Sequence, residues 1–119
     1  MTIHLRAAEL SADDYPVSRP LEAPSAVALE GPMQTRALIV FDAEKVTMGS
    51  WECEPGHSRW EFIDRGEFIH VLSGSMTVME DGREPETLTA GSTAVFPIGW
   101  TGTWTVHETL RKVFTVYRP

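Results

Sequence analysis

The sequence contains a single cysteine, Cys53, among its 119 residues. One thiol excludes a disulfide within the chain and any zinc site built from several cysteines. Basic residues are also few, because ten Lys and Arg stand against seventeen Asp and Glu, which gives a net charge of −7. Phosphate backbones and anionic lipid surfaces attract positive charge, so we expect neither nucleic acid nor a membrane as a partner.

Long apolar runs are absent as well. Residues 1–14 turn acidic early and lack the apolar core of a signal peptide. Together with the free thiol, this predicts a cytoplasmic location. Hydrophobic residues make up 42% of the chain, which is typical of one globular domain of this length.

The first 33 residues differ in texture from the rest. Half of the eight prolines lie there, at Pro16, Pro20, Pro24 and Pro32. No helical period is sustained, and residues 7–14 allow one short turn at most. Scattered apolar residues argue against the alternative of a disordered tail. We therefore expect an extended N-terminal arm over 1–33, packed along one sheet of a single domain over 34–119.

From Thr35 onward, β-rich runs alternate with turn signals. The expected strands cover 35–41, 45–53, 57–63, 67–72, 75–80, 86–89, 92–96, 102–107 and 111–117. Asp81-Gly82 is a dipeptide favoured in a two-residue type I′ hairpin. Short strands at this spacing, without a long helix, predict an all-β sandwich or barrel with antiparallel pairing.

Two motifs carry a family resemblance. Six residues separate Glu67 from Gly74, and five separate Gly91 from the sequence Pro97-Ile98-Gly99. On these residues the chain resembles the cupin family. The resemblance implies an all-β, cupin-type double-stranded β-helix, that is, a jelly-roll barrel. An antiparallel barrel without jelly-roll topology is the alternative.

A wider set of residues is similar to one branch of the family, the small cupins grouped with the (S)-ureidoglycine aminohydrolase cupin domain. It consists of Trp51, Trp60-Glu61-Phe62, Glu67, Val71-Leu72-Ser73-Gly74, Asp81-Gly82, Pro97-Ile98-Gly99-Trp100, Trp104 and Arg111-Lys112. The likeness covers roughly residues 46–117 and leaves the arm out.

The metal ligands of the family are mostly missing. The two histidine positions of the first motif hold Trp60 and Phe62, or Glu61 and Ile63 with a different gap. Gly102 stands at the histidine position of the second motif, so only Glu67 remains of four ligands. A metal needs three or four convergent donors. We therefore expect no metal centre and no cofactor.

The histidines offer little to replace these ligands. His70 lies three residues from Glu67, and an odd separation places the two on opposite faces of a strand. His57 could reach Glu67 from a neighbouring strand, which leaves a metal site through these two residues as an alternative. Otherwise His57, His70 and His107 read as polar strand residues, and Cys53 as a small buried hydrophobe.

Strand parity gathers a candidate pocket. If Glu67 faces inward, as the resemblance implies, Ile69 shares its face, because side chains two residues apart lie on one side of a strand. The expected lining is Trp51, Trp60, Phe62, Ile69, Trp104 and Lys112. Mostly apolar cavities with a few polar groups bind small molecules. The alternative is that the indole rings simply fill the barrel.

Glu67 is the candidate catalytic residue. A carboxylate inside a barrel costs free energy unless a partner compensates its charge. It could hold a metal, pair with Lys112 or Arg59, or act as an acid or base with a raised pKa. Pairing is the favoured outcome. Such a pocket should prefer a flat or short polar ligand with a cationic or hydrogen-bond-donating end, from which Glu67 could accept.

These observations favour a metal-free cupin that binds an unidentified small polar metabolite. The alternatives are a metal-dependent, aminohydrolase-like enzyme of ureide or nitrogen metabolism that uses Glu67, and a closed barrel without a ligand. A homodimer is expected, because sheet edges need protection and the resemblance implies pairing through sheets.

Overall fold

The computed structural model describes residues 1–22 and 26–119, and it is built almost entirely of β-strands. Two short 3-10 turns, Ala7–Glu9 and Ala12–Asp14, precede the strands. The strands are β1 (Val17–Pro20), β2 (Ala26–Ala28), β3 (Gln34–Ala43), β4 (Val46–Cys53), β5 (Gly56–Glu61), β6 (Gly66–Glu80), β7 (Glu86–Thr89), β8 (Thr93–Phe96) and β9 (Thr101–Tyr117). Among the described residues, no helix is long and apolar enough to cross a membrane.

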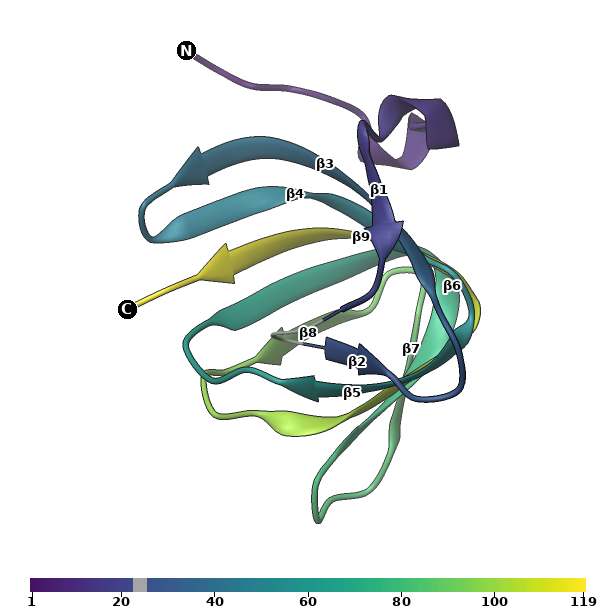
Figure 1. Ribbon diagram of the computed structural model, residues 1–119. Helices are drawn as coiled ribbons and strands as arrows, with labels where there is room; N and C mark the ends of the chain where they lie inside the picture. The colour runs from purple at the N-terminus through teal and green to yellow at the C-terminus, as the bar shows by residue number, and fades with distance from the viewer. Residues whose placement is uncertain (23–25) are drawn as a thin grey trace.

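The nine strands of residues 1–22 and 26–119 join one antiparallel sheet that curls around a core (Figure 1). The path β1-β3-β4-β9-β5-β2 forms one side, and β6 carries β7 and β8 on the other. Strand β9 joins the two sides of the sheet. Its second half pairs with β4, its first half pairs with β5, and β6 pairs with it along almost its whole length. The all-β, curled antiparallel fold predicted from the strand spacing is thereby confirmed.

Two pairs of expected strands are in fact single long strands. The runs 67–72 and 75–80 merge into β6, and 102–107 and 111–117 merge into β9. The glycine that suggested a turn, Gly74, instead sits among register shifts between Val71 and Met76. Its φ is +85°, and an added Cβ would collide with the carbonyl oxygen of Thr109. Such bulges bend a strand without ending it, which lets the sheet curl.

The Asp81-Gly82 turn is not a two-residue type I′ hairpin. That turn needs positive φ at both residues, but only Gly82 has it, at +78°. The β6–β7 ladder closes at Val78 and Glu86, so residues 79–85 form the loop. The reason is tertiary: the Asp81 N–H donates to the Thr101 carbonyl, which keeps β6 beside β9 beyond the expected turn.

The arm reaches both ends of the strand order. β1 pairs with β3, and β2 pairs with β5, so the arm forms both edge strands of this path. Residues 7–14 form two turns rather than the one expected, because Ser11 starts a second turn by donating to the Asp14 carboxylate. Pro24 lies outside the described residues.

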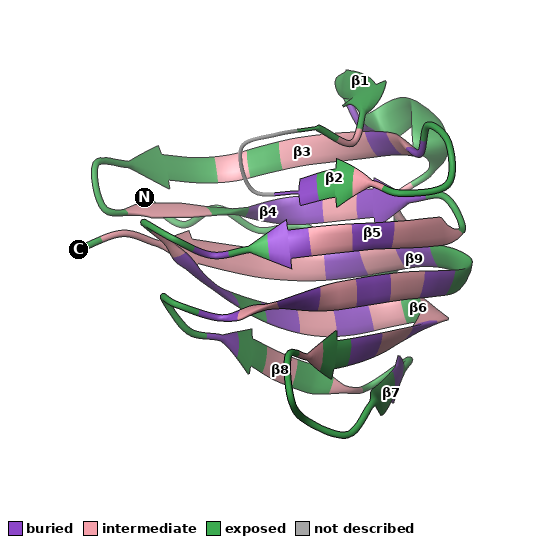
Figure 2. Cartoon of the chain, turned by 60° about the horizontal axis from the view of Figure 1, so that its bottom comes forward, coloured by how far each residue is buried: buried purple, intermediate pink, exposed green. Residues whose placement is uncertain are grey.

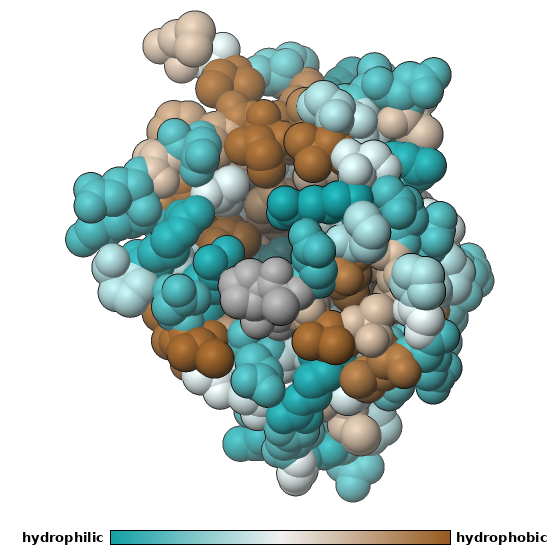
Figure 3. Space-filling view, viewed as in Figure 1, coloured by the Kyte–Doolittle hydropathy of each residue, from teal (hydrophilic) through white to brown (hydrophobic). Residues whose placement is uncertain are grey.

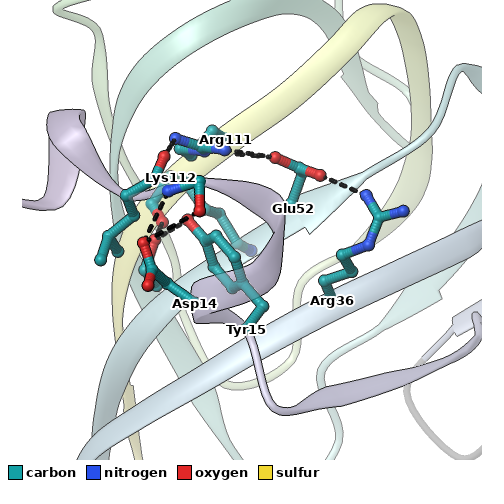
Figure 4. A network of polar contacts seen from close by, with 9 residues as sticks. Asp14, Tyr15, Arg36, Glu52, Arg111 and Lys112 are labelled. Carbon is teal, nitrogen blue, oxygen red and sulfur yellow. Dashed lines mark hydrogen bonds and ion pairs between the residues drawn. The ribbon is translucent and has the colours of Figure 1, made fainter.

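A polar network fixes the start of the arm on the outer face of the sheet (Figure 4). Tyr15 is buried, and its hydroxyl lies 2.8 Å from Ser50 Oγ, which donates to the Lys112 carbonyl. The Arg111 guanidinium donates to the Leu10 carbonyl and lies over the Tyr15 ring. The arm is therefore held directly behind the backbone of Lys112.

Glu52 organises the same network. Its carboxylate pairs with Arg36 and Arg111, each at 2.7 Å. Burial alone would raise the pKa of Glu52, but hydrogen bonds from Arg111 and Arg36 outweigh it, so that the pKa is lowered below its ordinary value of 4.5. The charged form is thus the one that fits the native network.

The core lies inside the curl and is rich in aromatic rings. Buried positions alternate along β5, β6 and the first half of β9, as expected for strands with one face inward (Figure 2). Trp60 stacks on Trp104 with ring centroids 3.9 Å apart. Phe62 stacks on Phe96 at 5.6 Å, so that the rings form one continuous layer.

One row of outward-facing residues is uncharged and mostly exposed. Cross-strand register places Phe41, Met48, Thr115, Phe68 and Val95 side by side across β3, β4, β9, β6 and β8. We call these five residues the outer apolar row. The exposed fractions of Phe41, Phe68 and Val95 are 46%, 42% and 56%.

Candidate ligand pocket

A cavity of about 300 Å³ lies between the arm and the inner face of the barrel. Figure 3 shows the molecule hollowed on this side, with hydrophobic side chains gathered above the hollow over β3. The cavity is lined by Arg19, Pro20, Leu21, Glu22, Ala26, Thr35, Trp51, Trp60, Phe62, Arg65, Glu67, Lys112, Phe114 and Val116.

A second hollow, of about 820 Å³, lies beside the loop 79–85. Its charged lining residues are exposed or half-buried at the surface, and none of the described residues that line it is a buried ionic group. The smaller cavity is the better candidate site, because convergent buried polar groups are what distinguish a binding pocket from a surface depression.

An ion pair forms the floor of the cavity. Lys112 Nζ lies 2.6 Å from Glu67 Oε2, and both side chains are almost fully buried. Glu67 comes from β6 and Lys112 from the neighbouring β9, both on the inner face. Of the outcomes expected for Glu67, the paired carboxylate is the one present, with Lys112 as the donor; Arg59 pairs with Asp81 instead.

Aromatic rings surround the Lys112 ammonium. Its Nζ lies 4.3 Å from the Trp51 ring centroid and 4.8 Å from that of Trp104. Trp60 and Phe114 lie within 6 Å as well. Aromatic faces attract cations most strongly where water is excluded. The ammonium is therefore held by Glu67 and by the rings together.

The structure brings most of the expected site residues to this cavity. Trp51, Trp60, Phe62, Glu67 and Lys112 all line it. Two others lie just outside the lining: Ile69 and Trp104 are fully buried in the core, where Trp104 packs behind Trp60. Close packing against Trp60 gives Trp104 a supporting position in the pocket wall.

The cavity lining also contains residues that the sequence did not indicate, and four of them form what we call the rim. Arg19, Glu22 and Ala26 come from the arm, and Arg65 from the turn before β6. Nothing in the periodicity of the arm marks these side chains, because its docking depends on distant partners. For Phe114, by contrast, parity with Lys112 on β9 was an available signal.

The donor set does not fit a metal centre of the kind found in the cupin family that the sequence resembles. Glu67 already accepts a hydrogen bond from Lys112, and His57 Nδ1 lies 2.7 Å from Thr105 Oγ1 on another part of the sheet. Within residues 1–22 and 26–119, no three His, Cys, Asp or Glu side chains are grouped to hold a metal ion. Cys53 is buried, and burial raises its pKa to about 12.

Comparisons with known proteins agree with this fold. A sequence profile of the EutQ-like cupin domain matches residues 42–114. Among curated proteins, none matches the chain. The solved structure of EutQ from Clostridium difficile is similar, with a TM-score of 0.62 and 18% identity, over 72% of this chain and 69% of that one.

Two structures of DUF861 family proteins are similar as well. The protein from Pseudomonas syringae pv. tomato gives a TM-score of 0.71 at 19% identity, over 84% of this chain but only 44% of that one. The protein from Thermotoga maritima gives 0.51 at 28% identity, over 55% of this chain and 73% of that one. These likenesses support the cupin fold that the two motifs predicted.

Proposed function

The chain belongs to the EutQ-like cupin domain family, and from this premise we propose that it binds a small polar metabolite, without a metal, in the cavity between arm and barrel. The observation that carries the proposal is the buried Glu67–Lys112 pair on the cavity floor. We also propose that the chain is related to the small cupins grouped with the (S)-ureidoglycine aminohydrolase cupin domain, and that the protein is cytoplasmic.

The ion pair supports a binding role because it is expensive as a purely structural element. Burying two charges costs several kcal/mol of desolvation, and well-packed apolar residues often replace such pairs without loss of stability. A barrel that only had to be closed would gain from such a replacement. A pair that faces a cavity, with Trp51 and Trp60 beside it, instead provides polar groups and flat walls to a ligand.

The metal-dependent aminohydrolase is the weaker alternative. It would require donors beside Glu67, and no position that carries histidine in other cupins holds a histidine here. Elemental analysis of the purified protein tests this part of the proposal. Stoichiometric manganese, iron, nickel or zinc that disappears in Glu67→Gln would overturn the metal-free assignment.

Ligand binding itself is tested with a library of small metabolites by saturation-transfer NMR. We expect at least one compound to bind, and Trp51→Ala to weaken it by about ten-fold or more, as for a buried aromatic contact. Met79→Ala is the matched control, because Met79 is 43% exposed on β6 and does not line the cavity. Absence of any binder, or binders indifferent to Trp51→Ala, would contradict the proposal.

We also propose that the protein forms a homodimer through the outer apolar row. Its four exposed hydrophobic side chains present roughly 350 Å² of apolar surface, on the order of half of the ~800 Å² per partner of a stable interface. The row is free of charge in a protein of net charge −7, so a second copy meets no repulsion there. Sedimentation should give twice 13.3 kDa for the native protein and a monomer for Phe68→Glu. A monomeric native protein at micromolar concentration would refute the dimer.

A further inference from the structure

We infer that the ligand of the cavity is a small organic anion, a flat carboxylate whose acid group is bound at the rim by Arg19 and Arg65. This inference rests on the proposed binding function and adds the chemical class of the ligand. Both arginines line the cavity, one from the arm and one from the turn that leads into β6.

The floor does not supply charge to a ligand. Glu67 and Lys112 neutralise each other at 2.6 Å. A cationic ligand that turned to Glu67 would have to displace the Lys112 ammonium from Trp51 and Trp104, whose ring centroids lie 4.3 and 4.8 Å away. An anionic group at the same depth would compete with Glu67 for its donor. The floor is therefore polar but neutral, and selection by charge falls to the rim.

The rim carries an excess of positive charge. Its charged lining residues are Arg19, Arg65 and Glu22, two cations and one anion. Arg65 also lies 3.4 Å from Asp64, but that carboxylate is 79% exposed, and exposed pairs of this kind are weak. In an acidic protein, a concave site with net positive charge concentrates anions. The planar guanidinium is suited to carboxylates, which it binds through two parallel hydrogen bonds.

Size and wall chemistry narrow the ligand further. A cavity of about 300 Å³ lies at the small end of the range for ligand pockets, which is about 300–1,000 Å³. It therefore suits a small compound. Trp51, Trp60 and Phe114 contribute ring surfaces, which favour a flat or aromatic body. A benzoate-sized acid meets each of these requirements.

The test uses three probes that share a phenyl ring and differ in charge: benzoate, benzamide and benzylammonium. Binding is followed by tryptophan fluorescence at low ionic strength. We expect benzoate to bind at least about ten-fold more tightly than the others, as for a charge-assisted contact worth about 1.4 kcal/mol or more. Arg19→Gln and Arg65→Gln should each weaken benzoate and leave benzamide unchanged. Arg83→Gln, an exposed arginine outside the cavity, is the matched control.

The outcomes separate this inference from the function beneath it. Benzamide or benzylammonium binding as tightly as benzoate would overturn the preference for anions while leaving the binding function intact. A benzoate affinity that both arginine variants leave unchanged would overturn the assignment of the rim. Failure of all three probes refutes the flat carboxylate as the ligand class. The binding function itself is refuted by the failure of every compound in the metabolite library, or by binders that Trp51→Ala leaves unaffected.

Discussion

Lys112→Met should destabilise the protein more than Glu67→Gln does, although both remove the same ion pair. Without Lys112, the Glu67 carboxylate is left with 5% of its surface exposed and without its donor. Without the Glu67 charge, the Lys112 ammonium still lies over the faces of Trp51 and Trp104, and the amide oxygen of the introduced glutamine can still accept a hydrogen bond from it.

The magnitudes follow from the two environments. Removing one partner of a buried pair costs about 3–5 kcal/mol when the other charge is left uncompensated, which is our expectation for Lys112→Met. Cation–π contacts retain about 0.5–2 kcal/mol, so Glu67→Gln should cost about 1–3 kcal/mol. The double variant buries no charge and should be more stable than Lys112→Met alone, with a coupling energy of about 2 kcal/mol.

Urea unfolding of the four proteins at pH 7, followed by circular dichroism, measures these differences. Circular dichroism is preferred to fluorescence because the substitutions lie beside three tryptophans. Costs that simply add in the double variant would show that the two side chains are not coupled. Equal costs for the two single variants would show that the aromatic rings do not hold the ammonium.

Three further predictions concern the outer network, the thiol and the core. Glu52→Gln should destabilise the protein at pH 7, and the difference in the free energy of unfolding should disappear at low pH. The native pKa of Glu52 is lowered, so its pairing stabilises the protein fully above the unfolded pKa of 4.5, and this stabilisation is lost as the pH falls through the native pKa. A difference that persists at about pH 2 in urea titrations would contradict this prediction. Cys53 should resist a disulfide-exchange reagent at pH 8 until urea is added, because burial raises its pKa to about 12; rapid reaction of the native protein would be inconsistent with the buried thiol. Trp104→Ala should cost about 3–5 kcal/mol in urea unfolding, from lost packing and from the lost contact of its ring with the Lys112 ammonium, and not from a hydrogen bond, because its indole N–H has no hydrogen-bond partner among the described residues; a loss below about 1 kcal/mol would mean that the core closes over the space.

The floor of the pocket was predictable because strand parity is a local rule. Side chains two residues apart share a face, so an inward Glu67 fixed the direction of Ile69, and Lys112 had to share its face with Phe114. The structure keeps all four on the inner side of β6 and β9. The motif resemblance supplied the one fact that parity lacks, namely which face is inside.

The rim and the turns depended on partners far away in the sequence. The arm is fixed by Tyr15 on Ser50 and by Arg111 on the Leu10 carbonyl, contacts that leave no periodic signal. The Asp81 turn was misjudged for the same reason: the dipeptide permits several turn types, and pairing of Asp81 with Arg59 and of its backbone with β9 selects one of them.

The entrance of the cavity and its floor come from different parts of the chain. The cupin profile matches residues 42–114 and so includes the ion pair, whereas Arg19, Glu22 and Ala26 of the rim precede it. A protein with the same barrel and a different N-terminal arm would have a different cavity entrance above the same ion pair. Under the proposed binding function, chimaeras that exchange residues 1–33 test whether the arm sets the choice of ligand.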